Sequence, residues 1–158
     1  MIERKSTKGI HVGNVKIGDF APVSIQSMIT TDPVHTAKAI DEINRLAEAG
    51  CELVRVAVPT MASAKALKDL KVGVSIPIIA DIHFDYRLAL EAIDNNIDGL
   101  RINPGNIGGE ANVLAVIEKA KPKKIPIRIG VNAGSLPEHI LQAYGCHPCA
   151  DGMVETGL

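Results

Sequence analysis

A regular alternation of short apolar runs with helical patterns, over residues 23–144, most constrains the fold of this chain. Each of five runs rich in Val, Ile and Leu is followed by a segment whose apolar residues recur at helical spacing. Strands that alternate with helices are typical of parallel sheets, because parallel neighbours need a crossover connection. The runs are nearly continuous in apolar character, which indicates strands that are covered on both faces.

The predicted elements follow from these patterns. Asp32 and Pro33 are predicted to cap and open the first helix. Residues 9–19 alternate in polarity on both sides of Gly13-Asn14, which predicts a β-hairpin ahead of the first strand. Residues 149–158 again show a helical pattern. We expect strands at 23–27, 53–58, 77–82, 99–103 and 127–132, and helices at 35–49, 61–70, 85–95, 110–120 and 136–144.

Two α/β architectures accept this order of elements. A doubly wound sheet of five strands fits the length and gathers ligands at one switch point. A (β/α) barrel needs about 250 residues and places functional side chains at the C-terminal ends of successive strands. The strand ends favour the barrel, so we expect an incomplete TIM barrel, with about five of its eight βα units, preceded by the hairpin.

Polar side chains stand late in every predicted strand. Residues two apart share a face of a strand, so each such pair points the same way. Three arginines that lie close together repel one another and lose hydration, which costs free energy unless an anion neutralises them. The planar guanidinium group matches the geometry of phosphate oxygens. The pattern therefore predicts a phosphate or diphosphate site, unless each arginine faces solvent or pairs locally. These residues are Gln26, Ser27, Arg55, Asp81, His83, Arg101, Asn103, Arg128 and Asn132.

Three further motifs leave alternatives open. Asp81 with His83 is also compatible with acid-base chemistry or metal ligation, and His83 alone with a core histidine. The glycine-rich stretch 103–109 precedes a helix and could present backbone N–H groups to an anion, or could be a simple turn. Cys146 and Cys149 form a lone Cys-x-x-Cys, for which a structural role is favoured over redox or metal chemistry.

Composition excludes several classes of protein. The formal net charge is −1 and aromatic residues make up 3% of the chain, which argues against a nucleic-acid partner. The N-terminus is charged where a signal peptide would be apolar, and no apolar run approaches the roughly 20 residues that span a bilayer. Three cysteines are too few for a disulfide scaffold. We therefore expect a cytoplasmic protein without a membrane partner.

Five stretches in this order resemble the N-terminal domain of the 4-hydroxy-3-methylbut-2-enyl diphosphate synthase family, and the likeness covers nearly the whole chain. They are "ERKSTKGIHVGNVKIGDFAPVSIQSM", "CELVRVAVP", "PIIADIHFDYRLAL", "GLRINPGNIG" and "IRIGVNAGSLP". The resemblance implies a TIM barrel that binds the diphosphate of 2-C-methyl-D-erythritol 2,4-cyclodiphosphate. It further implies reductive ring opening in the methylerythritol phosphate route to isoprenoids.

The resemblance also implies partners and a cofactor. Electrons would come from ferredoxin or flavodoxin through a [4Fe-4S] cluster held by a C-terminal domain, which caps the barrel of the other subunit of a homodimer. Residues 1–158 would be the N-terminal part of the substrate-binding barrel, without the cluster domain. The family's Cys-x-x-Cys-Gly-Arg motif is not matched, because Ala150 and Asp151 follow Cys149, so no metal ligand is assigned here.

The resemblance supports one set of diphosphate-binding residues, with Asp81 orienting an arginine or the imidazole behind them. The residues that act in proton transfer would lie outside the matched stretches. Two alternatives remain: an inactive or free-standing half-barrel that binds a phosphorylated ligand, and another phosphate-handling TIM-barrel enzyme such as a pterin-binding synthase. The set consists of Arg55, His83, Arg101, Asn103, Arg128 and Asn132.

Overall fold

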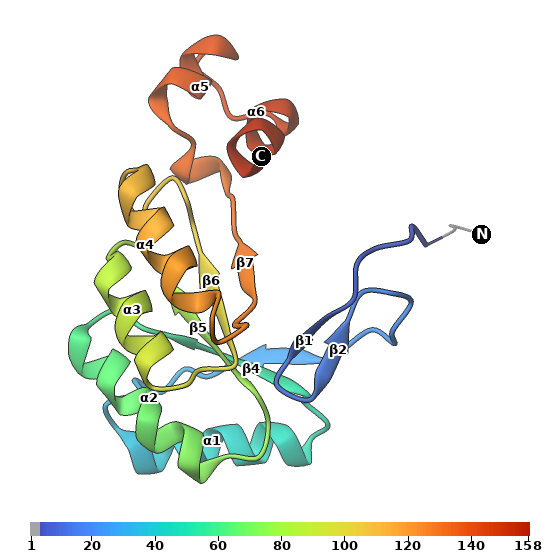
Figure 1. Ribbon diagram of the computed structural model, residues 1–158, viewed down its shortest axis with the longest axis vertical. Helices are drawn as coiled ribbons and strands as arrows, with labels where there is room; N and C mark the ends of the chain where they lie inside the picture. The colour runs from blue at the N-terminus through green and yellow to red at the C-terminus, as the bar shows by residue number, and fades with distance from the viewer. Residues whose placement is uncertain (1–3) are drawn as a thin grey trace.

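The computed structural model, which describes residues 4–158, is built on a five-stranded parallel sheet (Figure 1). Its spatial order follows the order of the chain, so each strand lies beside its neighbour in sequence. A doubly wound sheet would reverse direction at a switch point, whereas a barrel adds strands in order. The predicted incomplete barrel is confirmed, and it is not closed. The strands are β3 (Gln26–Met28), β4 (Leu53–Ala57), β5 (Ile78–Ile82), β6 (Gly99–Ile102) and β7 (Ile127–Ile129).

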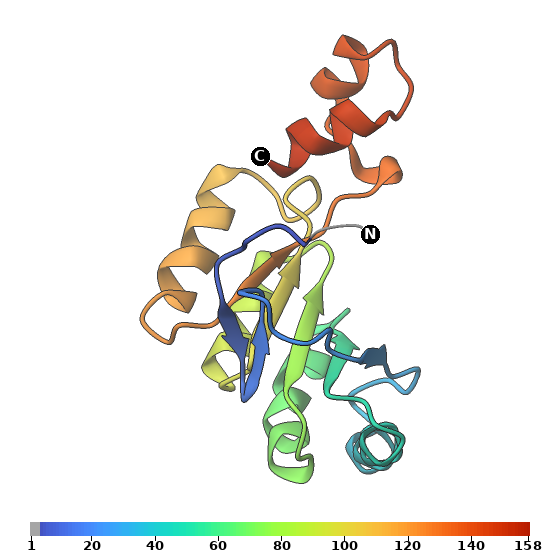
Figure 2. The ribbon, with the colours of Figure 1, turned by 90° about the vertical axis from the view of Figure 1, so that its right-hand side faces the viewer.

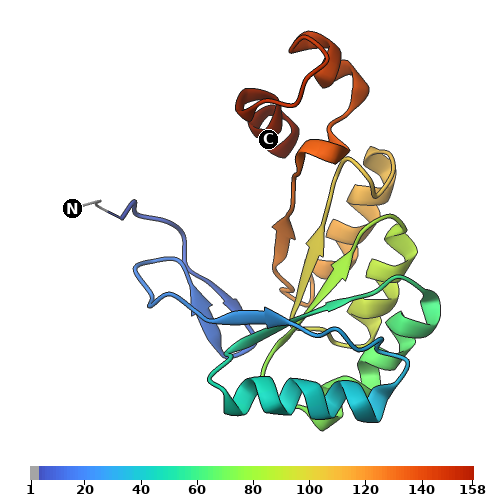
Figure 3. The same cartoon turned by 180° about the vertical axis from the view of Figure 1, so that it is seen from behind.

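Four helices cover one face of this sheet (Figures 1 and 3). They are α1 (Thr36–Glu48), α2 (Met61–Gly73), α3 (Tyr86–Asp94) and α4 (Glu110–Ala120). Val54, Val56 and Ile82 point from the sheet into a continuous core with apolar side chains of the helices. Burial of these residues removes apolar area from water, and each Å² removed stabilises the fold by about 25 cal/mol. This layer therefore holds the strands in place.

The predicted hairpin is present and covers part of the other, concave face of the sheet (Figure 2). It pairs β1 (Ile10–Val12) with β2 (Val15–Ile17) around Gly13, whose φ of 57° suits glycine. Val12 packs with Leu53 and Ile79 in a second buried cluster, at the beginnings of β4 and β5. The hairpin therefore fills the N-terminal end of the concave face and leaves the C-terminal end to polar residues.

A contact between the two edge strands shows how strongly the sheet curls. Arg128 Nη1 on β7 donates a hydrogen bond of 2.8 Å to Gln26 Oε1 on β3. In a flat sheet four strand spacings of about 4.8 Å would hold these strands roughly 19 Å apart. The side chains meet because both project from the concave side of a curved sheet, as in a barrel wall.

The segment after β7 projects beyond the C-terminal ends of the strands (Figure 1). It contains the 3₁₀ turn η1 (Ala133–Ser135) and the helices α5 (Glu138–Ala143) and α6 (Ala150–Gly157). The helical pattern predicted at 149–158 is thus confirmed, and α5 is shorter than the predicted 136–144. In the part of the chain that the structure describes, no helix has the length and apolar content to cross a membrane.

Two boundaries near the first strand differ from prediction. Asp32 does not cap α1, because its carboxylate accepts from Val34 N (3.0 Å) and closes a separate turn, so that the helix begins at Thr36. The strand predicted at 23–27 is shorter and later, since Ile25 N bonds to the Glu52 carboxylate instead of joining a strand ladder. Part of the charged N-terminal stretch, residues 1–3, lies outside the described residues.

Glu42 on α1 holds the loop that follows β3. Its carboxylate accepts hydrogen bonds from Thr30 N (2.9 Å), Thr30 Oγ1 (3.0 Å) and Thr31 N (3.0 Å). Burial tends to raise the pKa of Glu42, but the hydrogen bonds from Thr31 and Thr30 outweigh it and lower that pKa to about 2. The ionised side chain therefore fixes this loop at the C-terminal edge of the sheet.

Glu42→Gln is expected to destabilise the fold in a pH-dependent way. A lowered pKa adds stability above the ordinary value of 4.5, and this contribution is lost as pH falls toward about 2. Urea unfolding of both proteins between neutral and acid pH should show a larger free energy of unfolding for the wild type near neutrality, and this difference should disappear in acid. Glu48→Gln, at the exposed end of the same helix, is the control. An advantage that does not change with pH would contradict the assignment.

Candidate functional site: an arginine cluster at the strand ends

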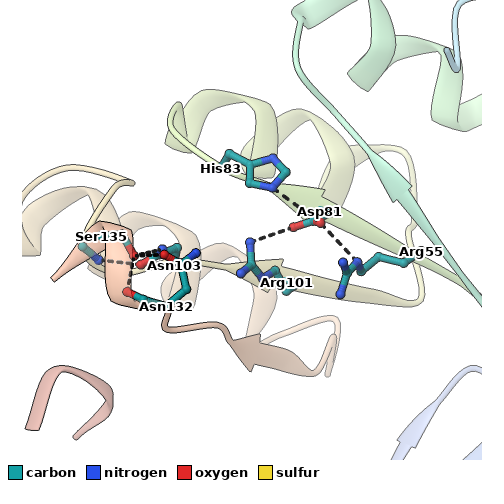
Figure 4. Close-up of polar contacts among 8 residues, drawn as sticks. Arg55, Asp81, His83, Arg101, Asn103, Asn132 and Ser135 are labelled. Carbon is teal, nitrogen blue, oxygen red and sulfur yellow. Dashed lines mark hydrogen bonds and ion pairs between the residues drawn. The ribbon is translucent and has the colours of Figure 1, made fainter. Parts of the chain in front are cut away.

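The carboxylate of Asp81, near the end of β5, organises the polar end of the concave face (Figure 4). Its side chain is 1% exposed. Arg101 Nη1 lies 3.1 Å from Oδ1, and Arg55 Nε lies 3.1 Å from Oδ2. His83 Nε2 is 3.7 Å from Oδ2. The structure thus brings together four of the residues expected from the sequence, on three adjacent strands.

Strand register explains why these side chains meet. Asp81 on β5 is directly opposite Arg101 on β6, and Arg101 is opposite Arg128 on β7. Arg55 lies two residues before Ala57, the partner of Asp81 on β4, so its side chain is on the same face. A shift of any strand by one residue would turn its charged group toward the helices.

The charges around Asp81 do not cancel. Arg55 and Arg101 contribute +2 and Asp81 contributes −1, which leaves +1 before His83 is counted. Arg55 Nε is buried and, despite its 3.1 Å distance from Asp81, has no hydrogen bond of acceptable geometry. A site with surplus positive charge and an unsatisfied donor can accept an anion, because the anion offsets the repulsion between the guanidinium groups.

Arg101 is held from its other side by a glycine. A Cβ atom added to Gly130, just beyond β7, would overlap the Arg101 guanidinium. The missing side chain lets the backbone approach the guanidinium while Arg101 Nη1 hydrogen-bonds to Asp81. Gly130 was not among the residues expected from the sequence, because a glycine in a strand pattern does not reveal which side chain occupies its space.

Arg128 lies on the same face but contacts a different partner. Its guanidinium is exposed and hydrogen-bonds to the Gln26 amide oxygen rather than to Asp81. The bond to a neutral amide leaves its charge uncompensated, so the three guanidiniums and one carboxylate sum to +2. Arg128 is therefore the third cation of the predicted set on the concave face.

Asn103 and Asn132 form a separate polar group with Ser135 (Figure 4). Asn103 Nδ2 donates to Ser135 Oγ (2.6 Å), and its Oδ1 accepts from Gly105 N (3.0 Å). Asn132 Oδ1 accepts from Gly134 N (3.1 Å). The two amides therefore connect the loops that follow β6 and β7, and the structure does not place them against the arginines. Ser135 was missed because a serine in a loop gives no sequence signal.

The Cys-x-x-Cys lies in the projecting segment and has a local structural role. Cys149 is the N-cap of α6, where its Sγ accepts from Gly152 N at 3.4 Å, and Cys146 is exposed. Within residues 4–158, no three His, Cys, Asp or Glu side chains are placed to hold one metal ion. A [4Fe-4S] cluster needs about four protein ligands, most of them cysteines, and these residues do not fit one.

A parallel α/β sheet that curls in strand order and carries cations at its C-terminal strand ends defines a domain of the TIM-barrel class. Residues 7–158 match the model of the GcpE TIM-barrel domain. The chain belongs to this family.

Curated relatives agree with the family match. The chain is 57% identical over 156 residues to the 4-hydroxy-3-methylbut-2-en-1-yl diphosphate synthase (flavodoxin) of Thermodesulfovibrio yellowstonii, covering 99% of the chain and 44% of that protein. It is 55% identical over 158 residues to the synthase of the same name from Bacillus mycoides, covering 100% of the chain and 43% of that protein. The chain thus spans less than half the length of these curated relatives.

Asp81→Asn is expected to destabilise the protein strongly. It removes the charge that Arg55 and Arg101 share, and loss of one member of a buried ion pair costs roughly 3 kcal/mol. Urea unfolding measures this change. Asp94→Asn, which breaks an ion pair with Lys119 at the surface, is the matched control and should cost less than about 1 kcal/mol. Equal effects of the two substitutions would show that Asp81 is not the centre of the cluster.

Gly130→Ala tests the packing around Arg101 without changing any charge. The new methyl group must displace the guanidinium from Asp81, so the free energy of unfolding should fall by about 1 to 3 kcal/mol. Gly157→Ala, at the exposed end of α6, is the control, because a Cβ atom there would make only an ordinary contact of 3.6 Å with Val131. A Gly130→Ala protein as stable as the wild type would mean that Arg101 has room to move.

Proposed function

We propose that this chain is the substrate-binding barrel portion of a 4-hydroxy-3-methylbut-2-en-1-yl diphosphate synthase, and that it binds the diphosphate of 2-C-methyl-D-erythritol 2,4-cyclodiphosphate. The whole enzyme would open that ring reductively, with loss of water, in isoprenoid biosynthesis. The surplus positive charge around Asp81, at the strand ends of a barrel wall, carries this proposal. The names of the curated relatives agree with it.

In this proposal the arginines bind phosphate oxygens and Asp81 orients two of them. Arg55, Arg101 and Arg128 come from neighbouring positions on one face, and each hydrogen bond to a charged group contributes about 1.5 to 3 kcal/mol. Their charge, less that of Asp81, is +2, which matches a dianionic cyclic diphosphate. His83, on the same face as Asp81, adds a donor to phosphate. The site would therefore hold the diphosphate and leave the carbon skeleton to the rest of the enzyme.

Asn103 and Asn132 have a less direct role in this proposal. Their amides already bond to Ser135 and to backbone N–H groups of the same loops. They would reach the ligand only if these loop contacts were exchanged for phosphate oxygens. Without that exchange, they contribute by fixing the loops after β6 and β7 at the rim of the site.

The redox part of the reaction is assigned to the longer protein. Flavodoxin, or alternatively ferredoxin, would supply electrons, and a [4Fe-4S] cluster held by a further domain would pass them to the substrate. A homodimer would place that domain of one subunit over the barrel of the other, in the cytoplasm, where thiols stay reduced. No step is assigned to Cys146 or Cys149.

Arg101→Ala is expected to weaken binding of inorganic diphosphate by about 2 to 4 kcal/mol, or roughly 30- to 900-fold. The reason is that Arg101 is largely buried beside Asp81 and faces the proposed anion position. Isothermal titration calorimetry measures the dissociation constant. Arg45→Ala, which removes an exposed arginine paired with Asp41 on α1, should leave it unchanged.

Three results separate the functional alternatives. Tight binding of the cyclic diphosphate that is lost in Arg101→Ala supports the proposal. Equal affinity for unrelated phosphomonoesters would favour a half-barrel that binds phosphorylated ligands without turnover. Wild-type affinity in Arg101→Ala would refute the anion site. The pterin-binding alternative gains no support from the family match.

A further inference from the structure

Gln26 is a polar side chain of the concave face that bonds to Arg128 but not to Asp81, the centre of the arginine cluster. It is half-buried on β3, at the opposite edge of the sheet from Arg128. Its Oε1 accepts the 2.8 Å hydrogen bond from Arg128 Nη1. No residue in the described range 4–158 accepts a hydrogen bond from Gln26 Nε2. One end of the amide is therefore fixed, and the other carries two free N–H donors.

The choice of an amide at this position has a chemical consequence. A glutamate of the same length would form an ion pair with Arg128 and cancel its charge. The glutamine oxygen still accepts a hydrogen bond from the guanidinium, and it leaves the charge of Arg128 available to a ligand. The two N–H donors of the amide then add neutral hydrogen-bond donors to a face that otherwise offers cations. Both properties suit an anion with several oxygens.

We propose that Gln26 is a further ligand-binding residue, which donates from Nε2 to a phosphate oxygen while its Oε1 positions Arg128. The inference rests on the proposed function, since it requires an anion at the arginine cluster. It extends the site to β3, the strand farthest in the sheet from β7. The anion would then be held from both edges of the curved sheet, by Gln26 and by Arg128.

A second interpretation of the same contact is purely structural. The bond between Gln26 and Arg128 could act only as a strap that maintains the curvature of the sheet. A strap would make the free energy of unfolding depend on Gln26, but the Nε2 protons would not respond to a ligand. The environment of these protons therefore distinguishes the two interpretations directly.

The test uses the side-chain amides of the wild-type chain labelled with ¹⁵N. The sequence contains two glutamines, Gln26 and Gln142, and Gln142 on α5 bonds to Glu138 away from the site. On titration with inorganic diphosphate, the Nε2 proton signals of Gln26 should shift and saturate with the dissociation constant found by calorimetry. Those of Gln142 should not move. Gln26→Ala identifies the signals by their loss.

Two variants measure the contribution of Gln26 to affinity. Gln26→Ala should weaken diphosphate binding about tenfold, the loss expected for one hydrogen bond to a charged group. Gln26→Glu keeps the size of the side chain but cancels the charge of Arg128, so its loss should be larger, on the order of a hundredfold. Gln142→Glu is the matched control for the added charge.

The outcomes separate this inference from the function on which it rests. If backbone amides at the strand ends shift with diphosphate while the Gln26 side-chain signals stay fixed, the anion site stands and the role of Gln26 is refuted. If no signal moves, both are refuted. Unchanged affinity in Gln26→Ala and Gln26→Glu also overturns the inference, and the wild-type spectrum does not depend on whether a variant folds.

Discussion

The buried carboxylate of Asp81 is the interaction on which the polar half of this structure depends. A carboxylate that is 1% exposed must be paired, and two guanidinium groups from the adjacent strands pair it. The same pairing stabilises the two arginines, because Arg55 and Arg101 would repel each other without a shared counter-ion. The positive charge that remains distinguishes the strand ends from an ion-pair network in which the charges balance.

The two faces of the curved sheet carry different kinds of side chains. The helix-facing side is apolar and packs α1 to α4 against the strands. The concave side is divided along the strands, with Val12 of the hairpin over the strand beginnings and the arginines at the strand ends. The contact between Gln26 and Arg128 shows that this curvature brings the edge strands within side-chain reach. Apolar packing and the charged cluster thus occupy different ends of the same surface.

The loops at the C-terminal edge are fixed by polar side chains rather than by an apolar core. Glu42 holds the loop after β3, and Asn103 with Ser135 connects the loops after β6 and β7. A backbone N–H group that donates to a side-chain oxygen can also donate to another acceptor in the same place. Such loops can border a ligand site and still adapt to its occupant.

The sequence by itself determined the order of strands and helices, the hairpin, and which strand-end residues share a face, because the periods of 3.6 and 2 are local properties of the backbone. It could not determine which polar residues meet. Register placed Arg101 opposite Asp81, and curvature placed Gln26 against Arg128, while Asn103 and Asn132 bonded to loops. Only the tertiary structure decided these partners, since they depend on contacts across strands as much as 102 residues apart in sequence.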